Sequence, residues 1–127
     1  MSPKAIKARD LTDEECGDLA VTAAEGGIGY WSRIDSYDWT RWQDAAGETR
    51  KSLPAGFVFY TVREDPDDNR TYKGDPIDIG TDLLRRGYRL FVEGGRRVED
   101  PGGPSYADAG EADAIVQFGC FGEIVYG

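Results

Sequence analysis

The sequence predicts an α+β protein, in which a small antiparallel sheet is covered by about three helices in a single domain. Two segments, residues 12–15 and 108–111, have the capping-box pattern that begins a helix. Residues 57–63, Phe-Val-Phe-Tyr-Thr-Val-Arg, are the aromatic and β-branched types that favour a strand. The 127 residues are enough for one domain with a hydrophobic core and too few for two.

The first helix is predicted to follow an N-terminal arm. Residues 1–10 are expected to form a loose basic arm or a short strand, within a domain that spans residues 1–127. The Thr12 hydroxyl can accept a bond from an early helix amide while the Glu15 side chain reaches back to the cap amide. Small and apolar residues then recur at helical spacing, at Cys16, Leu19, Ala20 and Ala23. The helix is expected to end at Gly26 or Gly27.

Three segments are expected to form the sheet. Residues 29–39 alternate as a strand would, and residues 57–63 form the strongest strand pattern in the chain. Asp65-Pro-Asp-Asp-Asn69 has the composition of a turn, so residues 70–73 are expected to return as the second arm of a hairpin.

Two more helices complete the prediction. Asp78 is expected to cap a helix that runs to about Phe91, and residues 94–107 are expected to form an exposed loop. Asp108 and Glu111 then begin a buried helix. The apolar residues 121–127 are expected to dock on the domain, as a coil or a short strand.

The charge of the chain argues against several classes of partner. A net charge of −9 and a pI near 4.4 disfavour direct binding to nucleic acid or to an anionic membrane. The charge is uneven, however. Residues 51–97 contain nine basic and eight acidic residues, whereas residues 98–127 contain six acidic and no basic residues. An anion could therefore bind in the middle third, and a basic protein could bind the acidic surface.

The absence of histidine excludes most familiar reaction chemistry. It removes the usual general base near neutral pH, the Ser-His and Cys-His pairs, and nearly every zinc site. We therefore predict no catalytic residue, no metal ligand and no cofactor. Carboxylate chemistry remains open, and the acids between Asp65 and Asp82 keep a magnesium-dependent hydrolase as one alternative.

The two cysteines and the lack of long apolar runs bear on the compartment. Cys16 and Cys120 are far apart and each lies in an apolar pattern, which favours buried free thiols over a disulfide. No run approaches the ~20 apolar residues of a membrane span, and the N-terminus lacks the apolar core of a signal peptide. We expect a cytoplasmic protein.

The composition of residues 30–42 is typical of a binding site. All three tryptophans of the chain fall there, and flat ligands stack on indole and guanidinium groups. Alternatively, the tryptophans are core anchors, since each can bury ~150–250 Å². The candidate ligand-binding residues in this segment are Trp31, Arg33, Trp39, Arg41 and Trp42.

The arginines on the predicted helix between Asp78 and Phe91 extend this hypothesis. Arg85, Arg86 and Arg89 could pair with a phosphate in a site shared between the subunits of a homo-oligomer. The alternative is a solvated helix face on which Asp82 pairs with Arg85 or Arg86.

Two segments have distinctive motifs. The first is Thr22-Ala-Ala-Glu-Gly-Gly-Ile-Gly-Tyr-Trp31, with the pattern Glu-Gly-Gly-x-x-Tyr-Trp. The second is residues 111–127, with Ala-Asp-x-Ile-x-Gln followed by Phe-Gly-Glu-Ile-Val-Tyr-Gly. Together they resemble small uncharacterised proteins of bacteriophages and prophages. The resemblance implies a phage accessory protein and no particular activity. We expect the two segments to form one packing unit, with Tyr30 or Trp31 against the small residues of the last helix.

Three functions follow as expectations. The first is non-enzymatic anti-defence binding, in which a phage-encoded protein sequesters a small anionic nucleotide such as a cyclic nucleotide immune signal of the host. The second is an acidic inhibitor or nucleic-acid mimic that docks on a basic host defence protein. The third is the magnesium-dependent hydrolase.

Overall fold

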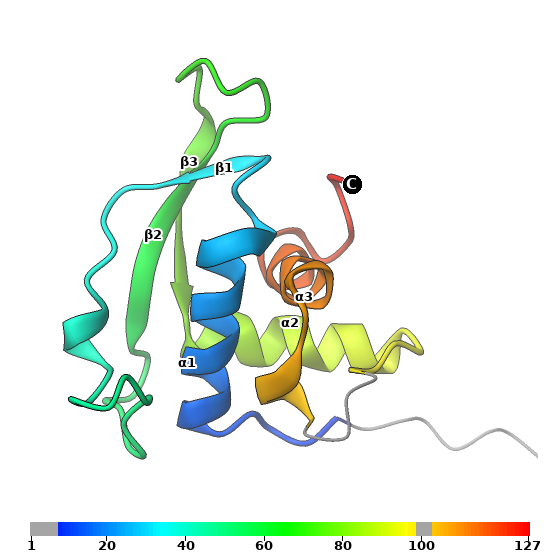
Figure 1. Cartoon of the computed structure of the whole chain (residues 1–127). Coiled ribbons are helices and arrows are strands. Elements are labelled where there is room, and N and C mark those ends of the chain that lie inside the picture. Colours follow the sequence, from blue (N-terminus) through cyan, green and yellow to red (C-terminus); the bar gives the residue numbers. More distant parts are fainter. Residues whose placement is uncertain (1–7, 99–102) are drawn as a thin grey trace, which may run out of the picture.

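The computed structural model describes residues 8–98 and 103–127, and in these it contains a three-stranded antiparallel sheet and three α-helices (Figure 1). The predicted α+β class is therefore confirmed. Residues 1–7 of the expected N-terminal arm lie outside the described part. In the sheet order, the strands are β1 (Ser32–Ile34), β2 (Val58–Glu64) and β3 (Lys73–Gly80), and the helices are α1 (Asp13–Thr22), α2 (Thr81–Glu93) and α3 (Ala109–Phe121).

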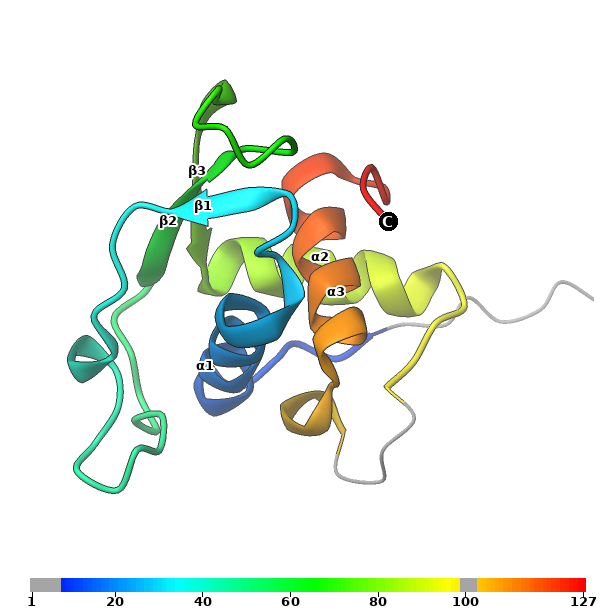
Figure 2. The same cartoon turned by 45° about the horizontal axis from the view of Figure 1, so that its top comes forward.

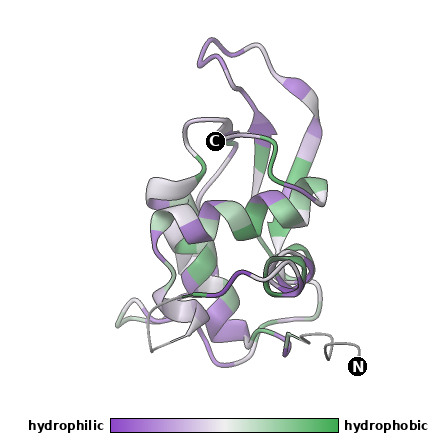
Figure 3. Cartoon of the chain, turned by 90° about the vertical axis from the view of Figure 1, so that its right-hand side faces the viewer, coloured by the Kyte–Doolittle hydropathy of each residue, from purple (hydrophilic) through white to green (hydrophobic). Residues whose placement is uncertain are grey.

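The helices lie on one side of the sheet. Figures 1 and 2 both show α1, α2 and α3 beside the same face of β2 and β3. The long segment between β1 and β2 runs alongside β2 (Figure 1) and packs on it through two aromatic rings: Tyr37 lies against Tyr60, and Trp42 lies against Phe59. Hydrophobic residues concentrate where the strands lie beside the helices, and hydrophilic residues gather at the β2–β3 turn (Figure 3).

Strand β1 is much shorter than the predicted strand over residues 29–39. The chain turns before it, because the amides of Trp31 and Ser32 both donate to the carbonyl of Ile28. After it, the Asp38 side chain accepts a bond from Thr40 N and begins a 3₁₀ turn at Trp39–Arg41. Alternation alone did not reveal these two local turns, whose hydrogen bonds compete with the sheet.

Strand β3 replaces two predicted elements. The second arm of the hairpin is Lys73–Gly80, not residues 70–73, because Arg70 has a positive φ of 63° and still belongs to the turn. Asp78 was predicted to cap α2, but it lies within β3, opposite Thr61, whose hydroxyl donates to its carboxylate at 2.9 Å. Helix α2 begins instead after Gly80, which has no side-chain cap.

The two predicted capping boxes are both present. Thr12 and Glu15 cap α1, and Asp108 and Glu111 cap α3, each pair with both reciprocal hydrogen bonds. Helix α1 continues into a π-helical turn at Ala23–Gly27, so the helix ends where the glycines predict. Residues 94–97 are exposed as expected of a loop, whereas Pro104 and Ala107 are buried by a 3₁₀ turn at Pro104–Tyr106.

Helices α2 and α3 cross at two glycines. A Cβ added at Gly87 would lie 2.1 Å from the carbonyl oxygen of Ile115, and one added at Gly119 would lie 2.6 Å from Leu83. Both distances are far below van der Waals contact. The crossing therefore depends on the absence of side chains at these two positions.

The two segments that resemble phage proteins pack on each other, as expected. The Tyr30 hydroxyl and the Trp31 Nε1 both donate to the Asp113 carboxylate, at 2.6 and 2.8 Å. The Gln117 Oε1 accepts bonds from the backbone amides of Val125 and Tyr126, each at 2.8 Å. The C-terminus is therefore docked, as a coil and not as a strand.

Candidate functional site

Two of the three tryptophans belong to the core. Trp31 and Trp42 are 0% exposed. One face of Trp31 stacks on Tyr126, with ring centroids 5.3 Å apart, and Trp42 makes edge contacts with Tyr37 and Phe59. Neither indole offers a ring face to a ligand, so the alternative of core anchors holds for both, and their predicted binding role is wrong for this structure.

The third tryptophan is different. Trp39 is 47% exposed, and its position is fixed by the 3₁₀ turn that begins at Asp38. Its ring lines a cavity beside the end of α1. Among the predicted stacking residues, Trp39 is the one whose ring remains accessible.

The arginines of the aromatic segment face two different neighbours. Arg33 Nε donates to the buried carboxylate of Asp65 at 3.2 Å, and its Nη2 pairs with Asp68. Arg41 is exposed and its guanidinium lies 5.2 Å from the centre of the Phe57 ring. Neither arginine lines the cavity beside Trp39.

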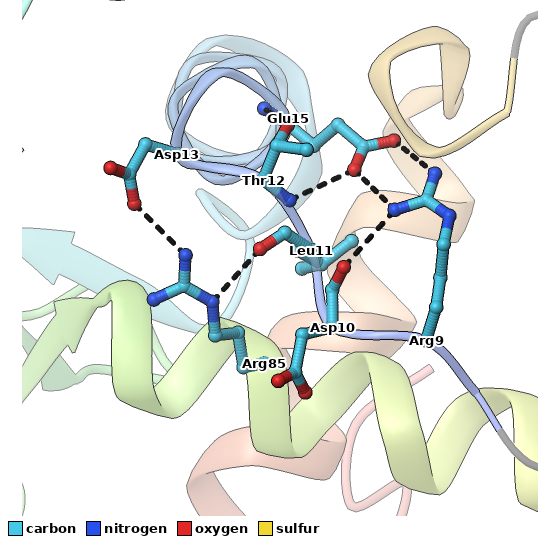
Figure 4. A network of polar contacts seen from close by, with 7 residues as sticks. All are labelled: Arg9, Asp10, Leu11, Thr12, Asp13, Glu15 and Arg85. Carbon is cyan, nitrogen blue, oxygen red and sulfur yellow. Dashed lines mark hydrogen bonds and ion pairs between the residues drawn. The ribbon is translucent and has the colours of Figure 1, made fainter. Parts of the chain in front are cut away.

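Arg85 on α2 binds residues at the start of α1. Arg85 donates from Nε to the carbonyl of Leu11 and from Nη2 to Asp13, both at 2.9 Å (Figure 4). The pKa of the Asp13 carboxyl is lowered, because Leu53 N donates a hydrogen bond to it and Arg85 pairs with it. Arg85 therefore ties α2 to the start of α1.

Arg86 and Arg89 do not join Arg85 in a site. Arg86 donates from Nη2 to the carbonyl of Gly119 at 2.5 Å, on α3. Arg89 is exposed on α2. The predicted nucleotide site is thus not assembled within this chain: two of its indoles are buried, and most of its arginines bind carboxylates or carbonyls of the fold.

Two adjoining cavities of about 450 and 440 Å³ lie where α1 meets the segment between β1 and β2. They share Gly47, and we call them together the α1 groove. Residues of the first cavity include Glu14, Asp18, Glu48, Thr49, Ser105 and Tyr106. Residues of the second include Val21, Glu25, Tyr37, Trp39 and Gln43.

Helix α1 supplies one wall of the whole groove. Glu14, Asp18 and Val21 are spaced at i, i+4 and i+7 and therefore share one face of α1. Glu25, in the π-helical turn that continues the helix, extends this wall. The opposite wall is a tight loop that is fixed by Asp44, whose Oδ1 accepts bonds from the amides of Ala46 and Glu48. A bridge between Gln43 and Thr49 closes this loop.

The groove is strongly acidic. Its lining contains four carboxylates and no lysine or arginine. Burial raises the pKa of Asp18, a hydrogen bond with Ser105 opposes this, and the carboxylates of Glu14, Glu15 and Glu48 raise it further. The negative charge at this wall is therefore not neutralised by the residues that form it.

This groove was not among the sites predicted from the sequence. In the sequence, the start of α1 indicates a helix cap, and the polar residues between β1 and β2 indicate a connection. The helical spacing of the carboxylates on α1 is visible in the sequence. The aromatic and acidic side chains that complete the groove, however, come from segments far along the chain. Several carboxylates of the acidic last third bind other groups of the fold: Asp108 and Glu111 cap α3, and Asp113 accepts a hydrogen bond from Trp31.

A third cavity, of about 410 Å³, lies between the end of α2 and the start of α3. Its lining includes Phe91, Arg96 and Arg97, together with Asp108 and Glu111. Arg96 also lies 5.5 Å above the centre of the Phe118 ring. This cavity is therefore of mixed charge.

The two cysteines are free thiols with little tendency to ionise. Burial raises the pKa of the Cys16 and Cys120 thiols to about 12, and both cysteines are free. Within residues 8–98 and 103–127, no three cysteine, aspartate or glutamate side chains are grouped so as to hold a metal ion. No helix in the described part of the chain is long and apolar enough to cross a membrane.

No protein-family model, curated protein or solved structure matches this chain.

Proposed function

We propose that this chain is a non-enzymatic binding protein that docks on a basic protein partner through its acidic surface. A defence protein of a bacterial host is the partner we propose, in keeping with the resemblance to phage accessory proteins. The second of the three expectations from the sequence is thus preferred over nucleotide sequestration.

The observation that supports this choice is the separation of the charges. Arg9, Arg33, Arg63 and Arg85 each pair with a carboxylate of the fold, and Arg86 binds a backbone carbonyl. These five arginines have internal partners, whereas the α1 groove is lined by four carboxylates without a cation. A groove of this kind attracts a positively charged surface and repels a phosphate.

Capture from host lysate tests the proposal. The chain is immobilised, and bound proteins are identified after washes at ~50 and ~200 mM salt. We expect a basic protein that is retained at the lower concentration and largely released at the higher one, because screening weakens contacts between exposed charges. The partner is then purified and its affinity measured directly. If no protein is retained at ~50 mM salt, the proposal is overturned.

A small anionic nucleotide remains a second candidate, now in the cavity beside Arg96. The supporting observation is a cavity of about 410 Å³, a volume in the range of small-ligand sites, whose lining includes Phe91 and Arg96 together with the acidic Asp108. Calorimetric titration with a panel of mononucleotides and cyclic nucleotides tests it. An Arg96→Glu variant is the control, and no binding tighter than ~100 μM would remove this candidate.

A further inference from the structure

The α1 groove combines two kinds of side chain that recognise cations. Carboxylates attract a positive charge, and the faces of aromatic rings bind it through their quadrupole. Three rings are available along the groove. Trp39 is 47% exposed, Tyr106 is 62% exposed, and Tyr37 is partly buried. The acidic and aromatic residues come from four separate segments and meet only in the folded chain.

The groove is built before any ligand arrives. Tyr37 is held by edge contact with Trp42 at 5.5 Å and by contact with Tyr60 at 5.7 Å. Glu48 is held by its backbone, since its amide donates to the Asp44 side chain and its carbonyl accepts from Asp44 N at 2.8 Å. The Tyr37 ring and the backbone of the Glu48 loop are therefore already ordered in the chain without a ligand.

The groove also contains an unsatisfied buried hydroxyl. Thr49 lines the acidic cavity and is 6% exposed, and its Oγ1 has no hydrogen-bond partner among the described residues. A Cβ at Gly17 would meet this oxygen at 2.1 Å, so the hydroxyl lies against α1, in the wall of the cavity. Buried polar groups without a partner are rare in folded proteins. This hydroxyl is closed off by the helix, so the groove presents its carboxylates and rings, and not this oxygen, to a ligand.

We propose that the α1 groove is the docking site for an arginine-bearing segment of the basic partner, with one guanidinium on Trp39 beside Glu25 and a second guanidinium beside Asp18 and Glu48. This inference rests on the proposed function and identifies the chemistry that the partner presents. It goes beyond general charge attraction, because it assigns the contact to one groove and one side-chain type.

Arginine fits this groove better than lysine. A guanidinium is planar, so it can stack on an indole while its edge donates to a carboxylate, and it is less strongly hydrated than an ammonium group. The two cavities, at about 450 and 440 Å³, lie side by side at Gly47, which suits two basic side chains from one extended peptide. No cation of this chain competes for the site among its lining residues.

Titration calorimetry with a defined probe tests the inference. The probe is a seven-residue glycine and serine peptide that contains two arginines, and it is compared with peptides that contain two lysines or two neutral citrullines. We expect saturable binding of the arginine peptide at ~50 mM salt, at least tenfold weaker binding of the lysine peptide, and none of the citrulline peptide. Equal affinity for the citrulline or the lysine peptide would overturn the assignment to arginine, as would no binding of any peptide at ~1 mM.

Variants of the chain locate the contact. Trp39→Ala and the double variant Asp18→Asn, Glu48→Gln are each expected to weaken binding of the arginine peptide at least tenfold. Asp67→Asn with Asp75→Asn removes the same charge from exposed positions of the β2–β3 hairpin and is expected to change affinity less than twofold. An equal loss in this control would mean that total charge, and not the groove, binds the peptide. Thermal unfolding of every variant confirms that each is folded.

The two proposals can fail separately. If the groove variants capture the host partner as well as the unmodified chain does, the docking site lies elsewhere and only this inference falls. If the unmodified chain captures no partner at low salt, the proposed function falls, whatever the peptide result.

Discussion

The ring of Trp31 stacks on the ring of Tyr126, with centroids 5.3 Å apart and planes inclined by 8°. The two residues lie at the ends of the two segments that resemble phage proteins. Asp113 and Gln117 connect them through hydrogen bonds to the Trp31 indole and to the Tyr126 backbone. A tryptophan that looked like a binding residue is therefore the partner of the C-terminus.

Removal of the Tyr126 ring should destabilise the fold. Tyr126→Ala exposes one face of Trp31 and leaves a space beside Phe121, so we expect a loss of about 2–4 kcal/mol in the free energy of unfolding. Urea denaturation followed by tryptophan fluorescence measures this loss. Tyr126→Phe is the matched control, because it removes only the hydroxyl that donates to Glu64 at 2.7 Å. Its cost should be about 1 kcal/mol or less. Equal stability of the alanine variant and the unmodified chain would contradict the docking of the tail.

The crossing of α2 and α3 should be sensitive to a single methyl group. In Gly87→Ala the new Cβ would lie 2.1 Å from the Ile115 carbonyl, so the two helices must move apart, and we expect a loss of about 3 kcal/mol. Gly29→Ala is the control, since no atom lies within 4 Å of a Cβ at that position. Chemical denaturation of both variants measures the difference. If the Gly87 variant is as stable as the Gly29 variant, the close crossing does not exist.

The parts of the fold that the sequence predicted are those set by neighbours along the chain. The boxes at Thr12 and Asp108 involve residues three positions apart, so they were visible without the fold. Asp78 failed as a cap because its surroundings are set by pairing with Thr61 of β2, seventeen residues away. The β3 strand outweighed a local capping preference.

The candidate site was harder to predict for the same reason. Burial of Trp31 is decided by Tyr126 and burial of Trp42 by Phe59, and no local pattern separates these two indoles from Trp39. Arg85 looked like an anion ligand on a helix face until Asp13, 72 residues away, came to lie beside it. Composition identified the side chains that could bind, and tertiary contacts selected among them.

The Asp18 carboxyl should make stability depend on pH. Its pKa is raised in the folded chain, so the folded state holds this proton more tightly than the unfolded state does. The ionised group therefore lowers stability above its folded pKa, and this cost disappears as the pH falls toward 3.8, the value without these neighbours. We expect Asp18→Asn to be more stable than the unmodified chain at pH 7, with the two converging in acid.

Denaturation curves of both proteins from pH 7 to pH 3 measure this difference. Asp13 and Glu15 have lowered pKa values, so in both proteins they contribute stability at pH 7 that is lost as the pH falls. The difference in stability between the two proteins removes this shared contribution. A difference that grows as the pH falls would contradict the assignment of the raised pKa to Asp18.

Both cysteines should resist alkylation while the chain is folded. The thiol pKa is raised from 9.0 to about 12 at Cys16 and at Cys120, because burial disfavours the thiolate. At pH 8 the reactive thiolate is then about a thousandfold rarer than in the unfolded chain. Iodoacetamide labelling followed by mass spectrometry should show little modification in buffer and two alkyl groups in urea. Rapid labelling of Cys16 in buffer would contradict its burial.

The exposure of one indole among three gives a direct spectroscopic test of the groove. All three tryptophans lie in the described residues, and Trp31 and Trp42 are 0% exposed, so acrylamide should quench mainly the emission of Trp39. We therefore expect Trp39→Phe to lose most of the quenchable signal, whereas Trp42→Phe retains it. The arginine peptide should alter the same emission, because a guanidinium stacked on the indole changes its surroundings and shields it from acrylamide. If calorimetry shows that the peptide binds while the emission and the quenching of Trp39 stay unchanged, the peptide does not contact this ring. The bound cation would then lie away from the aromatic half of the groove.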